Sequence, residues 1–231
     1  MIILVPFFGD VKRFRPVLDR WIDAYEASGC KIPWYMVGDR AEDLEAPCVR
    51  VNIEPFRDLI RPGQPFDHKG AIVCAAALQI AKPVLVLDSD AMLVRDPLPI
   101  LERFMLRPVS MPLDHGALVW FRTPRLEWPF ESVRKACAGV ILLGPAVHRP
   151  RLVAAYRRAW HQMKGCLPWR PNLAHLLEQY SWSVAMHGFG PSWLPVSLNW
   201  SSRHLGASPD VVIEHDYGHG KWNGARAPRN S

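Results

Sequence analysis

Two aspartates at the end of an apolar run are the residues in this sequence with the clearest chemistry. Val84–Leu87 reads V-L-V-L and is followed by Asp88, Ser89 and Asp90. A short, continuous apolar run predicts a buried central strand of an α/β sheet. Side chains two residues apart on extended backbone face the same way, so the two carboxylates can converge on one hard cation. We expect Mn²⁺ or Mg²⁺ there, held by carboxylates together with substrate phosphates.

The alternative interpretation of this stretch is a strand that ends in a solvated Asp/Ser turn, because Asp-x-Asp is a common tripeptide. The context favours a site, since a buried strand precedes the pair and a second apolar pair, Met92–Leu93, follows it. Ligands of open α/β sheets also bind beyond the carboxyl ends of strands, which is where Asp88 and Asp90 are expected.

A second group of candidate residues lies in the tail Glu214–Trp222, which reads E-H-D-Y-G-H-G-K-W. His215 follows the apolar run V-V-I, and imidazole is a good ligand for a borderline ion such as Mn²⁺. Gly218 and Gly220 allow the backbone to approach a ligand closely, and Lys221 supplies a point charge suited to phosphate. The combination predicts a clamp for a metal-bound diphosphate; the alternative is a flexible, glycine-rich loop.

The elements that must position these residues follow the pattern of an α/β fold. Periodicity and turn signals predict strands at Ile2–Pro6, Trp34–Val37, Val49–Ile53, Val84–Leu87, Val109–Pro112, Ala117–Phe121, Ala138–Leu143, Trp193–Val196 and Val211–Glu214. Helices are expected at Arg15–Ser28, Lys69–Ala81, Leu98–Phe104, Arg149–Met163 and Asn172–Met186. No linker divides the chain, so residues 1–231 are expected to form one domain.

Lys69 is expected in the first turn of its helix, with Asp67 as the N-cap. A cation in the first turn opposes the helix dipole, which favours a phosphate or a carboxylate as the partner of Lys69. A solvated lysine is the alternative.

Composition indicates an ordinary soluble globule, with 49% hydrophobic residues in 231. No apolar run approaches the roughly 20 residues that cross a bilayer, and the start reads as a strand rather than a signal peptide. Five scattered cysteines, without metal-type spacing, predict reduced thiols in a cytoplasmic protein.

The net charge of +6 comes mostly from arginine. The guanidinium group of arginine can bind a phosphate with two hydrogen bonds, so a phosphate-bearing partner is one interpretation. The basic stretch Arg149–Arg158 would then be the surface that binds it. The alternative is a GC-rich genome, which favours Arg, Ala and Pro together.

The pairing of L-D-S-D at Leu87–Asp90 with H-x-x-G-x-x-K-W at His215–Trp222 resembles the nucleotide-sugar glycosyltransferases of the GT-A fold. It is most similar to the retaining family that contains glycogenin and the bacterial lipooligosaccharide galactosyltransferases. That family's usual tail has a proline before the tryptophan, which this chain lacks. Weaker similarities cover Cys137–Leu143, the pair Glu178-Gln179, and Leu194–Asn199. Two departures stand out: Cys137 replaces an Asn that contacts the donor sugar in the family, and Glu178 replaces an Asp.

The resemblance implies a mixed, Rossmann-like sheet flanked by helices, and a UDP-sugar as donor. It implies that Asp88, Asp90 and His215 hold Mn²⁺ or Mg²⁺ and that Gln179 lies on the far face of the sugar. It implies that Glu178 or Asp114 bonds the sugar hydroxyls. The implied contacts to the nucleotide and its diphosphate are Pro6, Phe7, Phe8, Asp39, Lys69, Ser89, Gly218 and Lys221.

The acceptor stays open at this point. A soluble glycan, a protein or a hydroxymethylated DNA base would each fit, the last because of the basic stretch Arg149–Arg158. Two rival functions are a non-catalytic sugar-nucleotide or nucleic-acid binding module and a metal-dependent nucleotidyltransferase. The second usually carries a glycine-rich loop after its first strand, whereas Val5–Asp10 has a single glycine.

Overall fold

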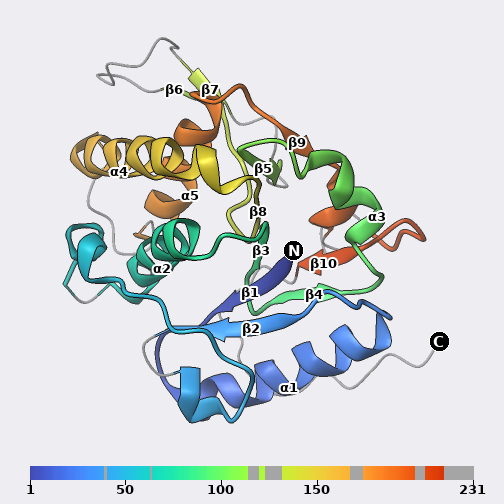
Figure 1. The fold of residues 1–231 in the computed structure, drawn as a ribbon. Coiled ribbons are helices and arrows are strands. Elements are labelled where there is room, and N and C mark those ends of the chain that lie inside the picture. Colours follow the sequence, from blue (N-terminus) through green and yellow to red (C-terminus); the bar gives the residue numbers. More distant parts are fainter. Residues whose placement is uncertain are drawn as a thin grey trace.

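A six-stranded mixed sheet forms the centre of the protein (Figure 1). The computed structural model describes residues 1–38, 41–62, 64–113, 120–122, 132–166, 174–200 and 206–215. Its strands are β1 (Ile2–Pro6), β2 (Trp34–Val37), β3 (Val84–Leu87), β4 (Ala91–Leu93), β5 (Val109–Pro112), β6 (Trp120–Arg122), β7 (Ser132–Arg134), β8 (Val140–Leu143), β9 (Trp193–Leu194) and β10 (Ile213–His215). Its helices are α1 (Val11–Ala27), α2 (Pro65–Gln79), α3 (Leu98–Leu101), α4 (Arg149–Cys166) and α5 (Ala174–His187), with short 3₁₀ turns between several elements.

The strand order of the sheet is β2-β1-β3-β8-β5-β9. Strand β1 pairs in parallel with β2 and β3, whereas β8 runs antiparallel between β3 and β5. Two small ribbons accompany the sheet, one made by β4 and β10 and the other by β6 and β7. The mixed α/β sheet expected from the sequence is therefore confirmed.

Alternating side chains of the central strands supply two separate cores. On one face, Ile2 and Leu4 pack with residues of α2, α4 and α5. On the other face, Ile3 and Val5 pack with α1 and with the β4–β10 ribbon. Figure 1 shows α2, α4 and α5 grouped on one side of the sheet and α1 on the other. The strands are covered on both faces, which explains why β3 and β8 read as continuous apolar runs.

The strand expected at Val49–Ile53 does not form: only its first residue bonds to the sheet, where Val49 N donates to Met36 O at 2.9 Å. This contact adjoins the isolated bridge between Met36 and Cys48, and the backbone of Asn52 then bonds to a side chain. The Gln79 amide accepts from Asn52 N at 2.9 Å and donates to Asn52 O at 2.9 Å. A 3₁₀ turn at Glu54–Leu59 then follows.

Two helix starts also differ from the expectation. Helix α1 begins at Val11 rather than Arg15, because the Asp10 side chain accepts from Lys12 N at 2.9 Å and caps the helix there. Helix α2 begins at Pro65, so Asp67 is inside its first turn and is not the N-cap. Asp67 is instead the buried partner of Arg61, whose Nε and Nη2 donate to it at 2.6 and 2.7 Å.

The remaining elements lie within a few residues of their predicted bounds, and residues 117–119 of one expected strand lie outside the described part of the chain. Cys30, Cys48, Cys74 and Cys137 are free thiols, as expected. Among the helices that the structure describes, none combines the length and apolar character needed to span a membrane.

Candidate active site

The turn after β3 places Asp88 and Asp90 at the carboxyl end of the central strand. Asp88 N donates to Gly139 O at 2.9 Å, which ties this turn to the segment that leads into β8. Ala91 N then donates to Asp88 O at 2.9 Å and closes the turn before β4 begins. Ser89, the residue between them in the sequence, is half-buried.

His215 joins the two aspartates through the β4–β10 ribbon. Strand β10 pairs antiparallel with β4, and His215 lies opposite Ala91, the residue after Asp90. Its Nε2 is 3.1 Å from Asp90 Oδ1. One ligand atom from each of Asp88, Asp90 and His215 lies within 4.8 Å of the others. Residues remote in sequence therefore converge at one point.

Gly139 makes room for the His215 ring. A Cβ on Gly139 would lie 2.0 Å from His215 Cε1 and 2.8 Å from its Nδ1. Any side chain larger than hydrogen at this position would displace the imidazole. The glycine of the A-G-V-I-L-L run is thus explained by close approach to the candidate metal ligand.

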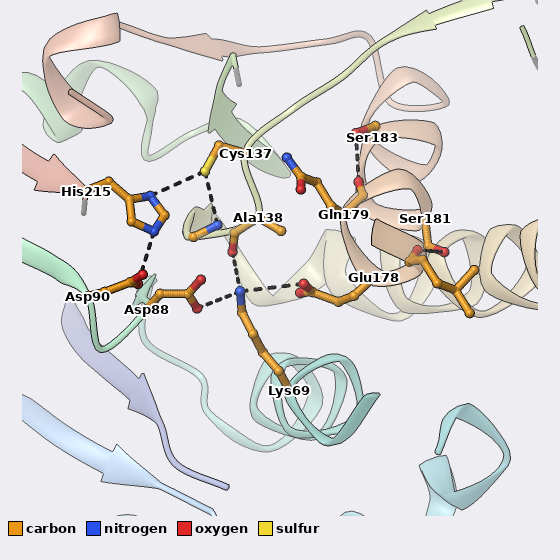
Figure 2. A network of polar contacts seen from close by, with 12 residues as sticks. Lys69, Asp88, Asp90, Cys137, Ala138, Glu178, Gln179, Ser181, Ser183 and His215 are labelled. Carbon is orange, nitrogen blue, oxygen red and sulfur yellow. Dashed lines mark hydrogen bonds and ion pairs between the residues drawn. The ribbon is translucent and has the colours of Figure 1, made fainter. Parts of the chain in front are cut away.

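Lys69 is the centre of a second group of contacts, on the far side of Asp88 from His215 (Figure 2). Its Nζ donates to Asp88 Oδ1 at 2.6 Å and to Ala138 O at 2.7 Å, and it lies 3.6 Å from Glu178 Oε2. The residue is only 5% exposed, so both carboxylates are needed to keep its charge inside the protein. Lys69, which lies on α2, therefore fixes the position of the Asp88 side chain.

Burial and neighbouring charges act against each other in this network. Burial alone would lower the pKa of Lys69, but Asp88 and Glu178 outweigh it and raise that pKa above its usual value. Burial raises the pKa of Glu178 to about 7, against the opposing effect of Lys69. Burial disfavours charge on Asp90 too, but His215 holds the pKa of Asp90 below its usual range.

Glu178 and Gln179 project from α5 in different directions, as consecutive helical residues must. Figure 2 shows Glu178 directed to Lys69 and Gln179 on the side that faces Cys137 and Ala138. Glu178 is 6% exposed, and its Oε1 has no hydrogen-bond partner among the described residues. Gln179 is half-buried. Glu178 therefore contacts the lysine, and Gln179 has the more open position.

The residues expected near the nucleotide differ in burial, and some of them lie outside the described part of the chain. Pro6 and Phe7 are buried, and the Phe7 ring packs against Phe14 with centroids 4.6 Å apart, while Phe8 is half-buried at the end of β1. Four predicted site residues lie outside the described part of the chain: Asp39, Asp114, Gly218 and Lys221.

Two further residues of the site contact His215, and the sequence had not indicated a part in metal binding for either. Asn199 is fully buried, and its Oδ1 lies 3.0 Å from His215 Nδ1. Cys137 Sγ lies 3.6 Å from the same nitrogen and accepts from Gly139 N at 3.4 Å. Both residues belong to the segments with weaker similarity to the family, Leu194–Asn199 and Cys137–Leu143. That similarity is the one feature of the sequence that could have pointed to them.

The basic stretch of α4 is less available than its sequence indicates. Arg149 is fully buried and donates to main-chain carbonyls at the end of α2 and just beyond it, and Arg157 pairs with Asp58 at 2.8 Å. Arg151 and Arg158 are exposed and line a groove of about 380 Å³. The other described residues that line it are His148, Ala154, Ala155, Gly188 and Phe189, and none of these is acidic. The groove lies at the opposite end of α5 from Glu178.

Comparison with known proteins gives structural matches alone, since no protein-family model and no curated protein sequence matches the chain. One similar structure is the galactosyltransferase LgtC in complex with donor and acceptor sugar analogues, with a TM-score of 0.59 and 12% identity over 93% of this chain and 86% of that one. An active-site mutant of LgtC gives a TM-score of 0.58 at the same identity and coverage. Mouse xyloside xylosyltransferase 1, in its apo form, gives a TM-score of 0.58 and 12% identity over 93% of this chain and 96% of that one.

These matches extend over nearly the whole chain, and the six-stranded sheet with an Asp-x-Asp turn after its central strand agrees with them. The chain therefore has the GT-A fold, the fold of the glycosyltransferases LgtC and xyloside xylosyltransferase 1.

Proposed function

We propose that the protein is a metal-dependent glycosyltransferase that moves a sugar from a UDP-sugar to an acceptor hydroxyl with retention of configuration. The observation that carries this proposal is the convergence of Asp88, Asp90 and His215 at the carboxyl end of β3, in a GT-A fold. Structural neighbours with this fold transfer galactose and xylose, as their names state.

The donor atoms at this point fit a divalent cation. Two carboxylates and one imidazole form a mixed oxygen and nitrogen set, which suits Mn²⁺ and also accepts Mg²⁺. Three protein ligands leave coordination positions for the oxygens of a diphosphate. When bound, the cation supplies a counter-charge for the diphosphate that leaves the sugar.

The chain's own residues keep that centre in order and bind the donor. Lys69 holds Asp88 through the 2.6 Å contact, so one ligand is oriented before any cation arrives. Gln179, in its half-buried position on α5, contacts the sugar on its far face. Phe8 and Ser89 line the nucleotide-binding site. Gly218 and Lys221 complete the clamp on the diphosphate, and Lys221 contributes a positive charge to the leaving group.

The acceptor is a hydroxyl on a soluble glycan or protein, or on a hydroxymethylated DNA base. The exposed groove residues Arg151 and Arg158 are the observation that keeps DNA among the acceptors to be tested, because arginine forks suit a phosphate backbone.

The experiment is the hydrolysis and transfer of a panel of UDP-sugars with Mn²⁺, in the presence and absence of DNA that contains hydroxymethylcytosine. We expect slow hydrolysis of one UDP-sugar by the wild type, abolished by EDTA and reduced at least about 100-fold in Asp90→Ala. Asp23→Ala removes an exposed carboxylate of α1 and is the matched control, with full activity.

Other outcomes separate the rival functions. Stimulation of sugar consumption by the modified DNA alone would identify the acceptor. Tight binding of UDP-sugar without turnover on any acceptor would indicate a binding module. Release of pyrophosphate from a nucleoside triphosphate and a sugar phosphate would indicate a nucleotidyltransferase. Asp90→Ala with wild-type transfer would refute the proposed metal role.

A further inference from the structure

Asn199 contacts the ring nitrogen of His215 that points away from the aspartates. Its Oδ1 is 3.0 Å from His215 Nδ1, while the opposite ring nitrogen, Nε2, is 3.1 Å from Asp90 Oδ1. Asn199 is fully buried and His215 is 4% exposed, so water does not compete for this contact. The segment is held in place by the main chain, because Trp200 N donates to Ile213 O at 3.0 Å.

The orientation of the Asn199 amide follows from its second partner. Its Nδ2 donates to Leu113 O at 3.0 Å, and a carbonyl can only accept. The amide nitrogen therefore faces Leu113, and the amide oxygen faces His215. Since an amide oxygen is only an acceptor, His215 Nδ1 must carry the hydrogen in this contact.

This arrangement determines which nitrogen of a neutral His215 ring is free. A metal-bound imidazole is neutral and has a single N–H. With that hydrogen on Nδ1 and directed to Asn199, the lone pair is on Nε2, which is the nitrogen beside Asp90. Ligating histidines in proteins generally donate their other N–H to an acceptor of this kind, which fixes both tautomer and ring orientation.

We infer that Asn199 is a positioning residue for the metal centre: it selects the tautomer of His215 whose Nε2 binds the cation. The inference rests on the proposed function only in taking Asp88, Asp90 and His215 as the ligands of a divalent cation. It assigns Asn199 no contact with the substrate or the cation.

Cys137 is the competing neighbour of His215 Nδ1 and provides a control. Its Sγ is 3.6 Å from Nδ1, and a thiol sulfur is a weak acceptor, so the Asn199 oxygen at 3.0 Å is the stronger partner. Replacement of the thiol in Cys137→Ala should change metal affinity less than loss of the Asn199 amide oxygen.

The test compares Asn199→Ala with Asn199→Asp, because the two substitutions separate the two contacts of the amide. Aspartate retains the acceptor for His215 Nδ1 and loses the donor to Leu113 O, whereas alanine loses both. The measurement is binding of Mn²⁺ alone, without nucleotide, followed by the electron paramagnetic resonance signal of the free ion. Circular dichroism and thermal unfolding report whether each variant is folded.

We expect Asn199→Ala to weaken Mn²⁺ binding by about 10- to 100-fold, the usual effect of removing such a partner. Asn199→Asp should bind within about threefold of the wild type or more tightly, and Cys137→Ala should also remain within about threefold. If alanine and aspartate lose the same affinity, the amide has only a structural role and the inference is overturned. Wild-type affinity in Asn199→Ala overturns it as well.

A measurement on the unaltered protein covers the case in which the variants do not fold. A long-range ¹H–¹⁵N spectrum with saturating Mg²⁺ should show the His215 proton on Nδ1, with the signal assigned from its loss in His215→Gln. A proton on Nε2 would overturn the inference alone. Absence of any Mn²⁺ binding by the wild type would instead overturn the proposed metal centre together with this inference, whereas metal binding without sugar transfer would count only against the proposed activity.

Discussion

His215 Nε2 lies 3.1 Å from Asp90 Oδ1, across 125 positions of the sequence. The pairing of β10 with β4 produces this contact, because it sets His215 opposite Ala91. The candidate metal centre therefore lies where the central sheet, through β3, meets the β4–β10 ribbon. Its geometry depends on residues that hold the turn and the ribbon together, as well as on the three ligands.

Lys69 is expected to stabilise the folded protein through its two carboxylate partners. Lys69→Met would leave Glu178 buried without its cation and should lower the free energy of unfolding by about 3–5 kcal/mol at pH 8. The measurement is urea unfolding followed by circular dichroism.

The double variant Lys69→Met/Glu178→Gln tests the reason for this loss. It removes the buried carboxylate that the lysine neutralises, so it should be more stable than Lys69→Met alone. A double variant as unstable as the single one would show that packing of the lysine stem, rather than charge, explains the effect.

The pKa of Glu178 predicts a pH dependence of stability. Burial raises this pKa to about 7, from an ordinary value of 4.5. Between these values the folded protein holds a proton that the unfolded chain releases, so the contribution of Glu178 to the free energy of unfolding falls as the pH rises. The fall is on the order of 3 kcal/mol in total and ends above pH 7.

The measurement compares the wild type with Glu178→Gln at several pH values from 4.5 to 8. The advantage of the wild type over the variant should decline across this window and then stay constant. A difference that does not change with pH would show that Glu178 titrates normally in the folded protein.

Arg149 should matter for stability, in contrast to its exposed neighbour Arg151. Its guanidinium donates to Gly144 O at 2.6 and 2.9 Å and to Lys82 O at 2.7 Å, and it also contacts Ile80 O. Arg149→Met leaves these carbonyls without their donors and should cost about 3 kcal/mol in the free energy of unfolding.

Arg151→Ala is the matched control, since Arg151 is exposed and lies two residues after Arg149 in the same helix. Its effect should be within about 0.5 kcal/mol. Equal losses in the two variants would indicate that the helix, and not the buried guanidinium, is what both substitutions disturb.

The fold was largely predictable because its strands carry strong local signals. Val84–Leu87 and Val140–Leu143 are continuous apolar runs, which is what strands covered on both faces require. The error at Val49–Ile53 has a different origin. That segment has a strand-like composition, but the backbone groups of Asn52 bond to the Gln79 side chain, a long-range contact that no local pattern encodes.

The same distinction applies to the candidate site. Asp88 and Asp90 follow from one stretch of sequence, and the resemblance linked them to His215. The partners of Lys69 come from the turn after β3, from α5 and from the segment before β8, so only the folded chain shows which carboxylates it contacts. The neighbours of His215 Nδ1 depend on ring orientation, which the sequence does not specify.

Gly139 offers a way to disturb the metal centre without touching a ligand. An added Cβ would lie 2.0 Å from His215 Cε1, so Gly139→Ala must displace the imidazole from its place beside Asp90. We expect Mn²⁺ affinity to fall at least about tenfold, as for the loss of a residue that orients a ligand. Gly165→Ala is the matched control, because no heavy atom lies within 4 Å of its added Cβ and the residue is inside α4. That variant should keep wild-type affinity, with a stability unchanged or raised by up to about 1 kcal/mol. Wild-type Mn²⁺ affinity in Gly139→Ala would contradict this prediction, because cation binding would then not depend on the position of the His215 ring beside Asp90.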